Sequence, residues 1–288
     1  MNRTLLAGVS ILSLLALVAA AAPALSDREW IARPDALNTG TGLSAPSRAH
    51  WMGTDELGRD VLARIVHGGR PSLLVAFVAT IVALGVGLPA GAIAGLRGSW
   101  GDLLLTRLME VTTAVPALLV IMLLASMLSG DPARAGSMRL VPLAVAIGLT
   151  RWVTIARYVR GAVIQAQADD YSAAAEALGA SRARVLFRHL VPGALAPALV
   201  AAAFGAGSAI LLEAALSFFG LGTHEPLPSW GKMVASAAVW PRAWWLIVAP
   251  GAVIALVVMG CNLAAEGLRE RAGRTGDQAR VGFRLPDR

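Results

Sequence analysis

Six long runs of apolar residues divide the chain, and polar or charged residues gather in the segments between them. A helix needs about 20 apolar residues to cross the hydrocarbon core of a bilayer, and each run reaches or approaches that length. The pattern therefore predicts an all-α, polytopic helical membrane protein with about six transmembrane helices. The expected helices are Leu5–Leu25, Leu73–Leu96, Leu103–Leu128, Leu140–Val159, Ala194–Leu216 and Trp244–Leu263.

Glycine and proline lie inside several of these runs, among them Pro89, Pro116 and Pro197. Membrane helices tolerate such residues because neighbouring helices can satisfy the backbone groups that they leave free. Small residues such as Gly85 and Gly87 also recur, and small residues let helix backbones approach one another closely. We therefore expect the helices to pack as a tight bundle.

The composition supports a membrane protein, since 56% of the 288 residues are hydrophobic and 15% are charged. A typical soluble domain has about 25% charged residues. The formal net charge is +7, and all but one of the 25 basic residues are Arg. A basic balance can indicate nucleic-acid binding. Here the Arg residues lie between long apolar runs, which favours contact with the cytoplasm and anionic lipid, so we expect no nucleic-acid partner. The single cysteine, Cys261, allows neither an intrachain disulfide nor a cysteine-based metal site.

The placement of Arg residues predicts the orientation in the membrane. Arg is dense from Arg151 to Pro192 and again after Glu266, and the positive-inside rule places both segments in the cytoplasm. With six spans, both chain termini are then cytoplasmic, and the segment from Ser26 to Arg70 faces outward. This outward segment also contains Arg, but an equal number of acidic residues accompanies it.

The first apolar run could be a cleavable signal peptide or a retained helix. It is longer than the apolar core of a typical signal peptide, which favours retention. We therefore expect four regions. Residues 1–25 form the first transmembrane helix, 26–70 an outward loop with an interfacial helix, 71–270 the main transmembrane domain, and 271–288 a cytoplasmic tail.

The segment between the fourth and fifth runs, residues 169–192, predicts two short helices in a cytoplasmic loop. The first helix presents four residues on one face, at the i, i+3, i+4, i+7 spacing of a helix. These four residues are Tyr171, Ala174, Ala175 and Leu178.

The second helix of this loop follows a glycine. Gly179 is suited to end the first helix, and Ser181 can cap the second. The second helix carries Arg184 and Arg188 on one side and reaches Pro192. A small, Ala-rich face with a glycine break fits a groove on a partner protein, whereas an ordinary amphipathic helix would lie on lipid head groups. Periodicity alone leaves both interpretations open.

Acidic residues just before the second run predict a capped helix. Asp55 is suited to cap a helix whose Leu57 and Val61 share one face, and Gly68–Gly69 would end it. This is the interfacial helix expected in the outward loop. We interpret the acidic residues as capping and Arg-pairing groups, because no His or further carboxylate cluster completes a metal or acid–base site.

Glu213 lies in the fifth run, where an ionisable group is costly and often functional. Two roles are compatible with the sequence: the Glu213 carboxylate forms structural hydrogen bonds, or it contacts the transported solute along a translocation path. Ser217 and Phe218 follow it, and Trp230 lies in a loop rich in Gly, Pro and aromatic residues. Non-helical backbone at membrane depth is tolerated where it is buried in protein or lines a cavity. These four residues are therefore candidates for lining or gating a translocation path.

Three stretches resemble known membrane proteins. Ala173–Ala175, Gly179 and Val191–Pro192 have the spacing of the cytoplasmic signature loop of bacterial ABC importer permeases. The stretches His50–Arg64 and Glu213–Met233 resemble segments typical of the dipeptide, oligopeptide and nickel permease group. The resemblance covers about residues 45 to 270, and the three stretches occur in the order that this group has.

The resemblance implies the permease subunit of an ATP-driven ABC importer for peptides or nickel, located in the cytoplasmic (inner) membrane. In that family the signature loop forms a coupling helix that docks on the ATPase. The implied partners are a second homologous permease subunit, two ATP-binding-cassette ATPase subunits and an extracytoplasmic substrate-binding protein. The chain itself would not be an enzyme. Because it has no phosphate-binding loop, we expect it to hold no cofactor and its partners to bind ATP.

Two other classes of protein are alternatives. A self-sufficient secondary transporter of small solutes would need an intramembrane carboxylate relay and usually an internal repeat, and neither is evident. A membrane enzyme would need a catalytic site, but the four His residues are scattered along the chain without metal-ligand spacing. Within the importer interpretation, peptides and nickel chelates both fit as the transported solute.

Overall fold

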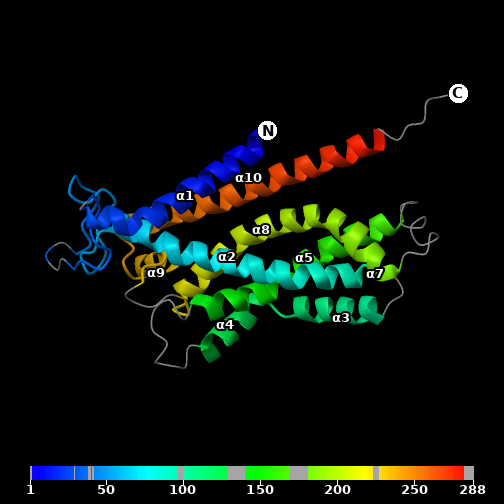
Figure 1. Ribbon diagram of the computed structural model, residues 1–288. Coiled ribbons are helices and arrows are strands. Elements are labelled where there is room, and N and C mark those ends of the chain that lie inside the picture. Colours follow the sequence, from blue (N-terminus) through cyan, green and yellow to red (C-terminus); the bar gives the residue numbers. More distant parts are fainter. Residues whose placement is uncertain are drawn as a thin grey trace.

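The computed structural model describes residues 2–28, 30–37, 40, 42–96, 100–128, 140–168, 181–222 and 227–281. Apart from one isolated bridge between Thr54 and Asp60, the regular structure in these ranges is helical (Figure 1). The prediction of an all-α protein is therefore confirmed. The elements are α1 (Arg3–Asp27), α2 (Val61–Ala94), α3 (Trp100–Ala114), α4 (Ala117–Leu128), α5 (Leu140–Gln167), α7 (Arg182–Val185), the π-helical turn η3 (Leu186–Leu190), α8 (Val191–Phe218), α9 (Trp230–Val239) and α10 (Trp245–Val281).

Five of the described helices are long and apolar enough to cross a membrane, namely α1, α2, α5, α8 and α10. Helices α3 and α4 meet the same criterion as a pair, but they are bent by 85° at Val115–Pro116. The expected single helix Leu103–Leu128 is therefore wrong. Pro116 has no N–H group to donate and disfavours a helical conformation at the residue before it, which accounts for the break. Counting the bent pair as one span, the described residues contain six candidate spans, in agreement with the prediction of about six.

Helices α2, α5 and α8 form the centre of the bundle (Figure 1). The backbones of α2 and α5 are in direct contact at glycines. A Cβ atom at Gly87 would lie 2.7 Å from the carbonyl oxygen of Trp152, and one at Gly148 would lie 2.7 Å from the carbonyl oxygen of Ala79. Small residues therefore set the spacing of this helix pair, as the sequence predicted.

Helix α1 lies along α10, although the two are the first and last helices of the chain (Figure 1). Gly8 faces the backbone of Gly260 and Ala264, and Gly267 faces Leu5. Contacts shift toward the C-terminal end of α10 as they approach the N-terminal end of α1, so the two helices run antiparallel. The start of α1 and the late part of α10 lie at the same end of the bundle, where Asn2 donates a hydrogen bond to the Glu270 carboxylate.

Loop residues 42–60 and α9 gather at the opposite end of the bundle (Figure 1). Helix α2 begins there at Val61, and the Asp60 side chain caps it by accepting a hydrogen bond from the Ala63 backbone N–H at 2.9 Å. The expected interfacial helix capped by Asp55 is wrong. Asp55 lies in a turn before the helix and accepts hydrogen bonds from backbone N–H groups within that turn.

The expected helix end at Gly68–Gly69 is also wrong, because α2 continues through both glycines to Ala94. A Cβ atom at Gly69 would lie 3.0 Å from Ala19 Cβ and 3.2 Å from Trp230 Cζ2. These glycines therefore give room for α1 and α9 to pack against α2. At the other terminus α10 continues to Val281, so residue 271 is not a structural boundary.

Candidate functional site

The described part of the expected coupling loop lies between α5 and α8, at the end of the bundle away from the 42–60 loop (Figure 1). It consists of α7 and η3, which continue into α8 without a break, so the second helix predicted for this loop is the first part of a longer helix and not a separate short one. The Ser181 hydroxyl accepts a hydrogen bond from the Arg184 backbone N–H at 3.4 Å, in the position of an N-cap. Pro192 is exposed and lies in the first turn of α8. Tyr171, Ala174, Ala175, Leu178 and Gly179 fall outside the described residues.

One face of α7–η3 anchors this segment in the bundle. Val185, Leu186 and Leu190 are buried in a hydrophobic cluster with residues of α2, α5 and α8. Burial of one such side chain contributes roughly 1.5–3 kcal/mol. The position of the segment is therefore fixed by its packing against the central helices.

The other face of the same segment is exposed. Phe187 has 70% of its surface exposed, and Arg184 and Arg188 on either side of it are exposed as well. An aromatic side chain and two guanidinium groups are residue types enriched at the energetic centres of protein interfaces. The exposed face of the segment therefore consists of residue types that are common in protein interfaces.

Glu213 forms a buried polar cluster within the subunit. Its carboxylate is 0% exposed and accepts hydrogen bonds from the Ser72 hydroxyl of α2 and the Ser217 hydroxyl of its own helix α8, each at 2.8 Å. The indole N–H of Trp230 donates to the Ile65 carbonyl oxygen of α2 at 2.9 Å, and Trp230 is 2% exposed. Three of the four candidates for the translocation path, Glu213, Ser217 and Trp230, are therefore buried. Their hydrogen bonds connect α2 with α8 and with α9.

Phe218, the fourth path candidate, points away from that cluster. It is 41% exposed and packs edge-to-face on Phe219, with ring centroids 5.5 Å apart. The structure therefore does not bring all four residues together. A role of any of them in a translocation path stays a prediction.

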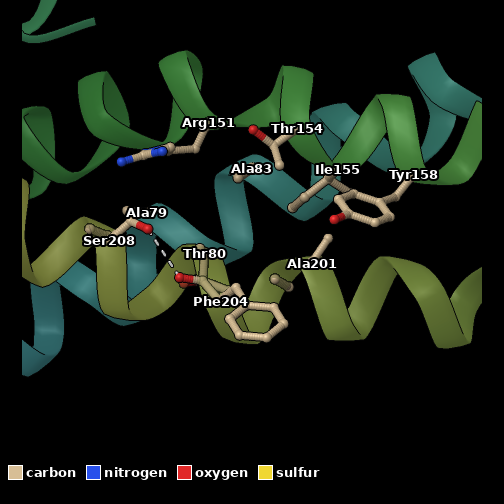
Figure 2. Close-up of a pocket in the computed structure, with 13 residues that line it drawn as sticks. Ala79, Thr80, Ala83, Arg151, Thr154, Ile155, Tyr158, Ala201, Phe204 and Ser208 are labelled. Atoms are coloured by element: carbon tan, nitrogen blue, oxygen red, sulfur yellow. Dashed lines mark hydrogen bonds between the residues drawn. The ribbon is translucent and has the colours of Figure 1, made fainter. Parts of the chain in front are cut away.

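A cavity of about 150 Å³ lies between α2, α5 and α8 (Figure 2). Its polar residues are Arg151, Thr154 and Tyr158 along α5, Thr80 on α2 and Ser208 on α8. Alanine and glycine form much of the remaining wall. In Figure 2 the α5 side chains face the α8 residues across the gap between the two helices.

Arg151 is the residue of this cavity that sequence reasoning missed. The positive-inside rule groups it with the cytoplasmic Arg residues, but it lies inside α5, eleven residues after Leu140. That distance is about 16 Å along a helix. An Arg in the middle of an apolar run was the available signal, because charged residues within spans are rare and commonly functional.

Acidic residues of the 42–60 loop pair with basic side chains. The Asp55 carboxylate accepts from Arg59 Nε at 2.7 Å, and Arg64 Nε lies 3.6 Å from the same carboxylate. His50 Nδ1 lies 2.9 Å from Asp60 Oδ2. This arrangement agrees with the interpretation of these residues as pairing and capping groups. These ion pairs hold the loop that precedes α2 in one conformation.

The fold resembles membrane subunits of ABC transporters. A chain of the MetNI methionine ABC transporter aligns with a TM-score of 0.56 and 16% identity, over 73% of this chain and 96% of that chain. A chain of an amino acid ABC transporter aligns with a TM-score of 0.53 and 19% identity, over 74% of this chain and 94% of that chain. Together with the sequence relatives below, this architecture defines a membrane-spanning permease subunit of an ATP-driven ABC importer. Residues 87–274 match the model of one family, and the chain belongs to it: the binding-protein-dependent transport system inner membrane components.

Relatives within this family cover most of the chain. The dipeptide transport system permease protein DppC of Alkalihalophilus pseudofirmus is 36% identical over 270 residues, which is 93% of this chain and 85% of the relative. The oligopeptide transport system permease protein OppC of Bacillus subtilis is 34% identical, with coverage of 93% and 85%. The di/tripeptide transport system permease protein DppC of Pseudomonas aeruginosa is 37% identical, with coverage of 76% and 70%.

Membership in this family settles the class of protein. The relatives are named as permease proteins of dipeptide and oligopeptide transport systems rather than as enzymes, and the family description names transport that depends on a binding protein. The family confirms the resemblance to ABC importer permeases and the inner-membrane location. A self-sufficient secondary transporter and a membrane enzyme are set aside accordingly.

Proposed function

We propose that this chain is a permease subunit of a peptide importer and that it pairs with a second, homologous permease subunit. Two ATP-binding-cassette ATPase subunits bind on the cytoplasmic side, and an extracytoplasmic binding protein delivers the peptide on the other side. Peptide is favoured over nickel because the three relatives described above are named for the transport of dipeptides, tripeptides or oligopeptides. Nickel complexes are the second candidate solute.

The coupling role is supported by the segment formed by α7 and η3, which has one buried face and one exposed face. One face is anchored in the cluster of α2, α5 and α8, and the other presents Phe187 between two exposed Arg residues. A partner that moves this segment also moves the helices to which it is packed. ATP hydrolysis in a separate ATPase is thereby coupled to rocking of the membrane helices. The ATP itself is bound by the partner, and this chain supplies no cofactor site.

The proposed orientation places α7 and both chain termini in the cytoplasm. The start of α1 and the late part of α10 meet at one end of the bundle, and α7 lies toward the same end in Figure 1. The segments flanking that end are the Arg-rich ones, which the positive-inside rule assigns to the cytoplasm. The 42–60 loop and α9 then face the substrate-binding protein.

The test of the coupling role is co-purification of the assembled transporter from its native membrane in mild detergent. Phe187→Ser removes the exposed aromatic side chain while leaving the buried face of α7–η3 intact. We expect it to lower recovery of the ATPase at least about tenfold, the loss that corresponds to 1.4 kcal/mol of binding free energy. Phe219→Ser is the matched control, because Phe219 is also exposed but lies near the opposite end of α8.

Recovery of the ATPase at wild-type levels with Phe187→Ser would exclude this surface as the docking site. The solute is tested separately by ATP-dependent uptake of labelled alanine peptides and of nickel in the same cells. Uptake of nickel but of no peptide would replace peptide by the second candidate.

A further inference from the structure

Arg151 differs from the other Arg residues of α5 in its hydrogen bonding. Arg157 donates to the Thr113 hydroxyl at 3.0 Å, and Arg160 donates to the Asp102 carboxylate at 2.9 Å. The Nε–H group of Arg151 is buried, and none of the described residues accepts a hydrogen bond from it. A buried donor without a partner costs about 1–3 kcal/mol. The side chain is held in the cavity between α2, α5 and α8 at that cost.

We propose that Arg151 binds the C-terminal carboxylate of the transported peptide as the peptide passes through this cavity. The inference rests on the proposed function and adds the chemical group by which the membrane subunit recognises its substrate. A guanidinium group presents a planar fork of N–H donors that matches the two oxygens of a carboxylate. Thr154 and Tyr158 line the same cavity from α5, so their hydroxyls are further donors for a peptide that occupies it.

The remaining cavity wall favours recognition of the carboxylate over recognition of side chains. Among the described residues that line it, none is acidic, and many are Ala or Gly, including Ala79, Ala83 and Gly205. A small apolar wall accepts side chains of different size without specific contacts. Arg151 is then the charged group that a peptide meets in this cavity. It binds the C-terminal carboxylate, which all free peptides share.

The nearest candidate acid on α8 is already engaged. Glu213 accepts hydrogen bonds from Ser72 and Ser217 and has no ion pair among the described residues. The head groups of lipids are also poorly placed to reach Arg151. It lies about 16 Å along α5 from Leu140, between three packed helices, whereas phosphates lie at the two faces of a hydrocarbon core about 30 Å thick. A carboxylate that enters through the transport path fits the position better.

The experiment compares uptake of alanine dipeptide and tripeptide as free acids and as C-terminal amides. Cells carry the complete transporter with wild-type permease, Arg151→Gln, Arg151→Lys or Arg157→Gln, and mass spectrometry measures initial uptake. The substrate-binding protein is the same in every strain, so its own preference cancels when the acid-to-amide ratio of a variant is divided by that of the wild type.

We expect Arg151→Gln to lower the acid-to-amide ratio at least about tenfold, mainly through slower uptake of the acid, a change worth 1.4 kcal/mol. Arg151→Lys keeps the charge and should retain part of the preference. Arg157→Gln removes a charge from the same helix and should leave the ratio at its wild-type value. An unchanged ratio with Arg151→Gln would overturn the proposal.

Equal loss of acid and amide uptake in Arg151→Gln would also overturn the proposal, because it would show that Arg151 holds the transporter together, for example by pairing with a carboxylate of the second permease subunit. Co-purification of the partner subunits with the variant reports that outcome directly. If the wild-type transporter takes up neither form of either peptide in an ATP-dependent manner, the proposed peptide importer fails, and the role of Arg151 fails with it.

Discussion

Substitution of Gly87 by alanine tests the close contact on which the centre of the bundle depends. The added Cβ atom would lie 2.7 Å from the Trp152 carbonyl oxygen and 2.8 Å from Ile155 Cβ. Carbon atoms in van der Waals contact are about 3.5–4.0 Å apart, so α2 and α5 would have to separate by roughly 1 Å. Both obstructing atoms belong to the backbone or to a Cβ atom, which a change of rotamer cannot move.

The expected magnitude follows from the cost of overpacking. Adding a methyl group to a tightly packed core destabilises by about 1–3 kcal/mol, and contact with backbone favours the upper part of that range. Gly85→Ala is the matched control on the same helix. Gly85 is exposed, and nothing lies within 4 Å of a Cβ atom built there. Alanine favours a helix over glycine by up to about 1 kcal/mol, so this variant should be as stable as the wild type or slightly more stable.

Thermal unfolding of the purified protein in detergent, followed by tryptophan fluorescence, measures the difference. A gap of about 3 kcal/mol between the two variants corresponds to roughly 6–12 °C in Tm for a chain of this size. A Tm for Gly87→Ala equal to or above that of Gly85→Ala would refute the reasoning. It would mean that α2 and α5 are not in backbone contact at this position.

Three further substitutions address the other features described. Glu213→Ala should be less stable than Glu213→Gln by about 1–3 kcal/mol, because alanine leaves two buried serine hydroxyls without an acceptor. Equal melting temperatures of the two variants would contradict this prediction. Asp55→Asn should lower the free energy of unfolding by about 3 kcal/mol, because it removes the buried carboxylate that Arg59 contacts at 2.7 Å and leaves Glu56 at 3.8 Å; a denaturation curve that matches the wild type would exclude such a contribution. Gly179→Trp should leave membrane insertion intact and abolish association of the ATPase, as measured by co-purification, and a variant that still binds the ATPase and supports uptake would show the coupling-helix assignment to be wrong.

The membrane helices could be located from the sequence because the bilayer imposes a length and a composition on any span. The bend at Pro116 could not be located in this way. Pro71, Pro89 and Pro250 lie inside helices that continue, whereas Pro116 lies at a break of 85°. The sequence shows the missing N–H group in each case. Whether neighbouring helices satisfy the freed carbonyl group is a property of the packed bundle.

The start of α2 was misplaced because two acidic residues could serve as its cap. Asp55 and Asp60 are both good N-cap residues, and the chain between them can form either a helix or a turn. The structure forms a turn, with Gly53 and Gly58 at φ angles of 75° and 73°. Those angles lie in the left-handed region that glycine adopts at low cost. The sequence shows the glycines, but it does not show which conformation they adopt.

The candidate sites differ in how far the sequence could define them. Spacing in the sequence indicates Ser181, Arg184 and Arg188, and they lie together on the described part of the predicted coupling loop. Arg151 was visible as a charge within an apolar run, but a one-dimensional pattern does not show which neighbouring helices enclose it. Its cavity exists because α2 and α8 present small residues at the same depth.

The pairing of α1 with α10 has a consequence for the order in which the protein is assembled. A ribosome delivers α1 to the membrane before α10, so the small-residue face of α1 at Gly8 has no α10 to contact while the helices between them are being made. Until then α1 is held by its contact with α2 near Ala19 and by lipid. Arrival of α10 closes the bundle in a single late step. A nascent chain that stops before residue 245 therefore leaves the face of α1 around Gly8 without its protein contact, although α1 still packs on α2.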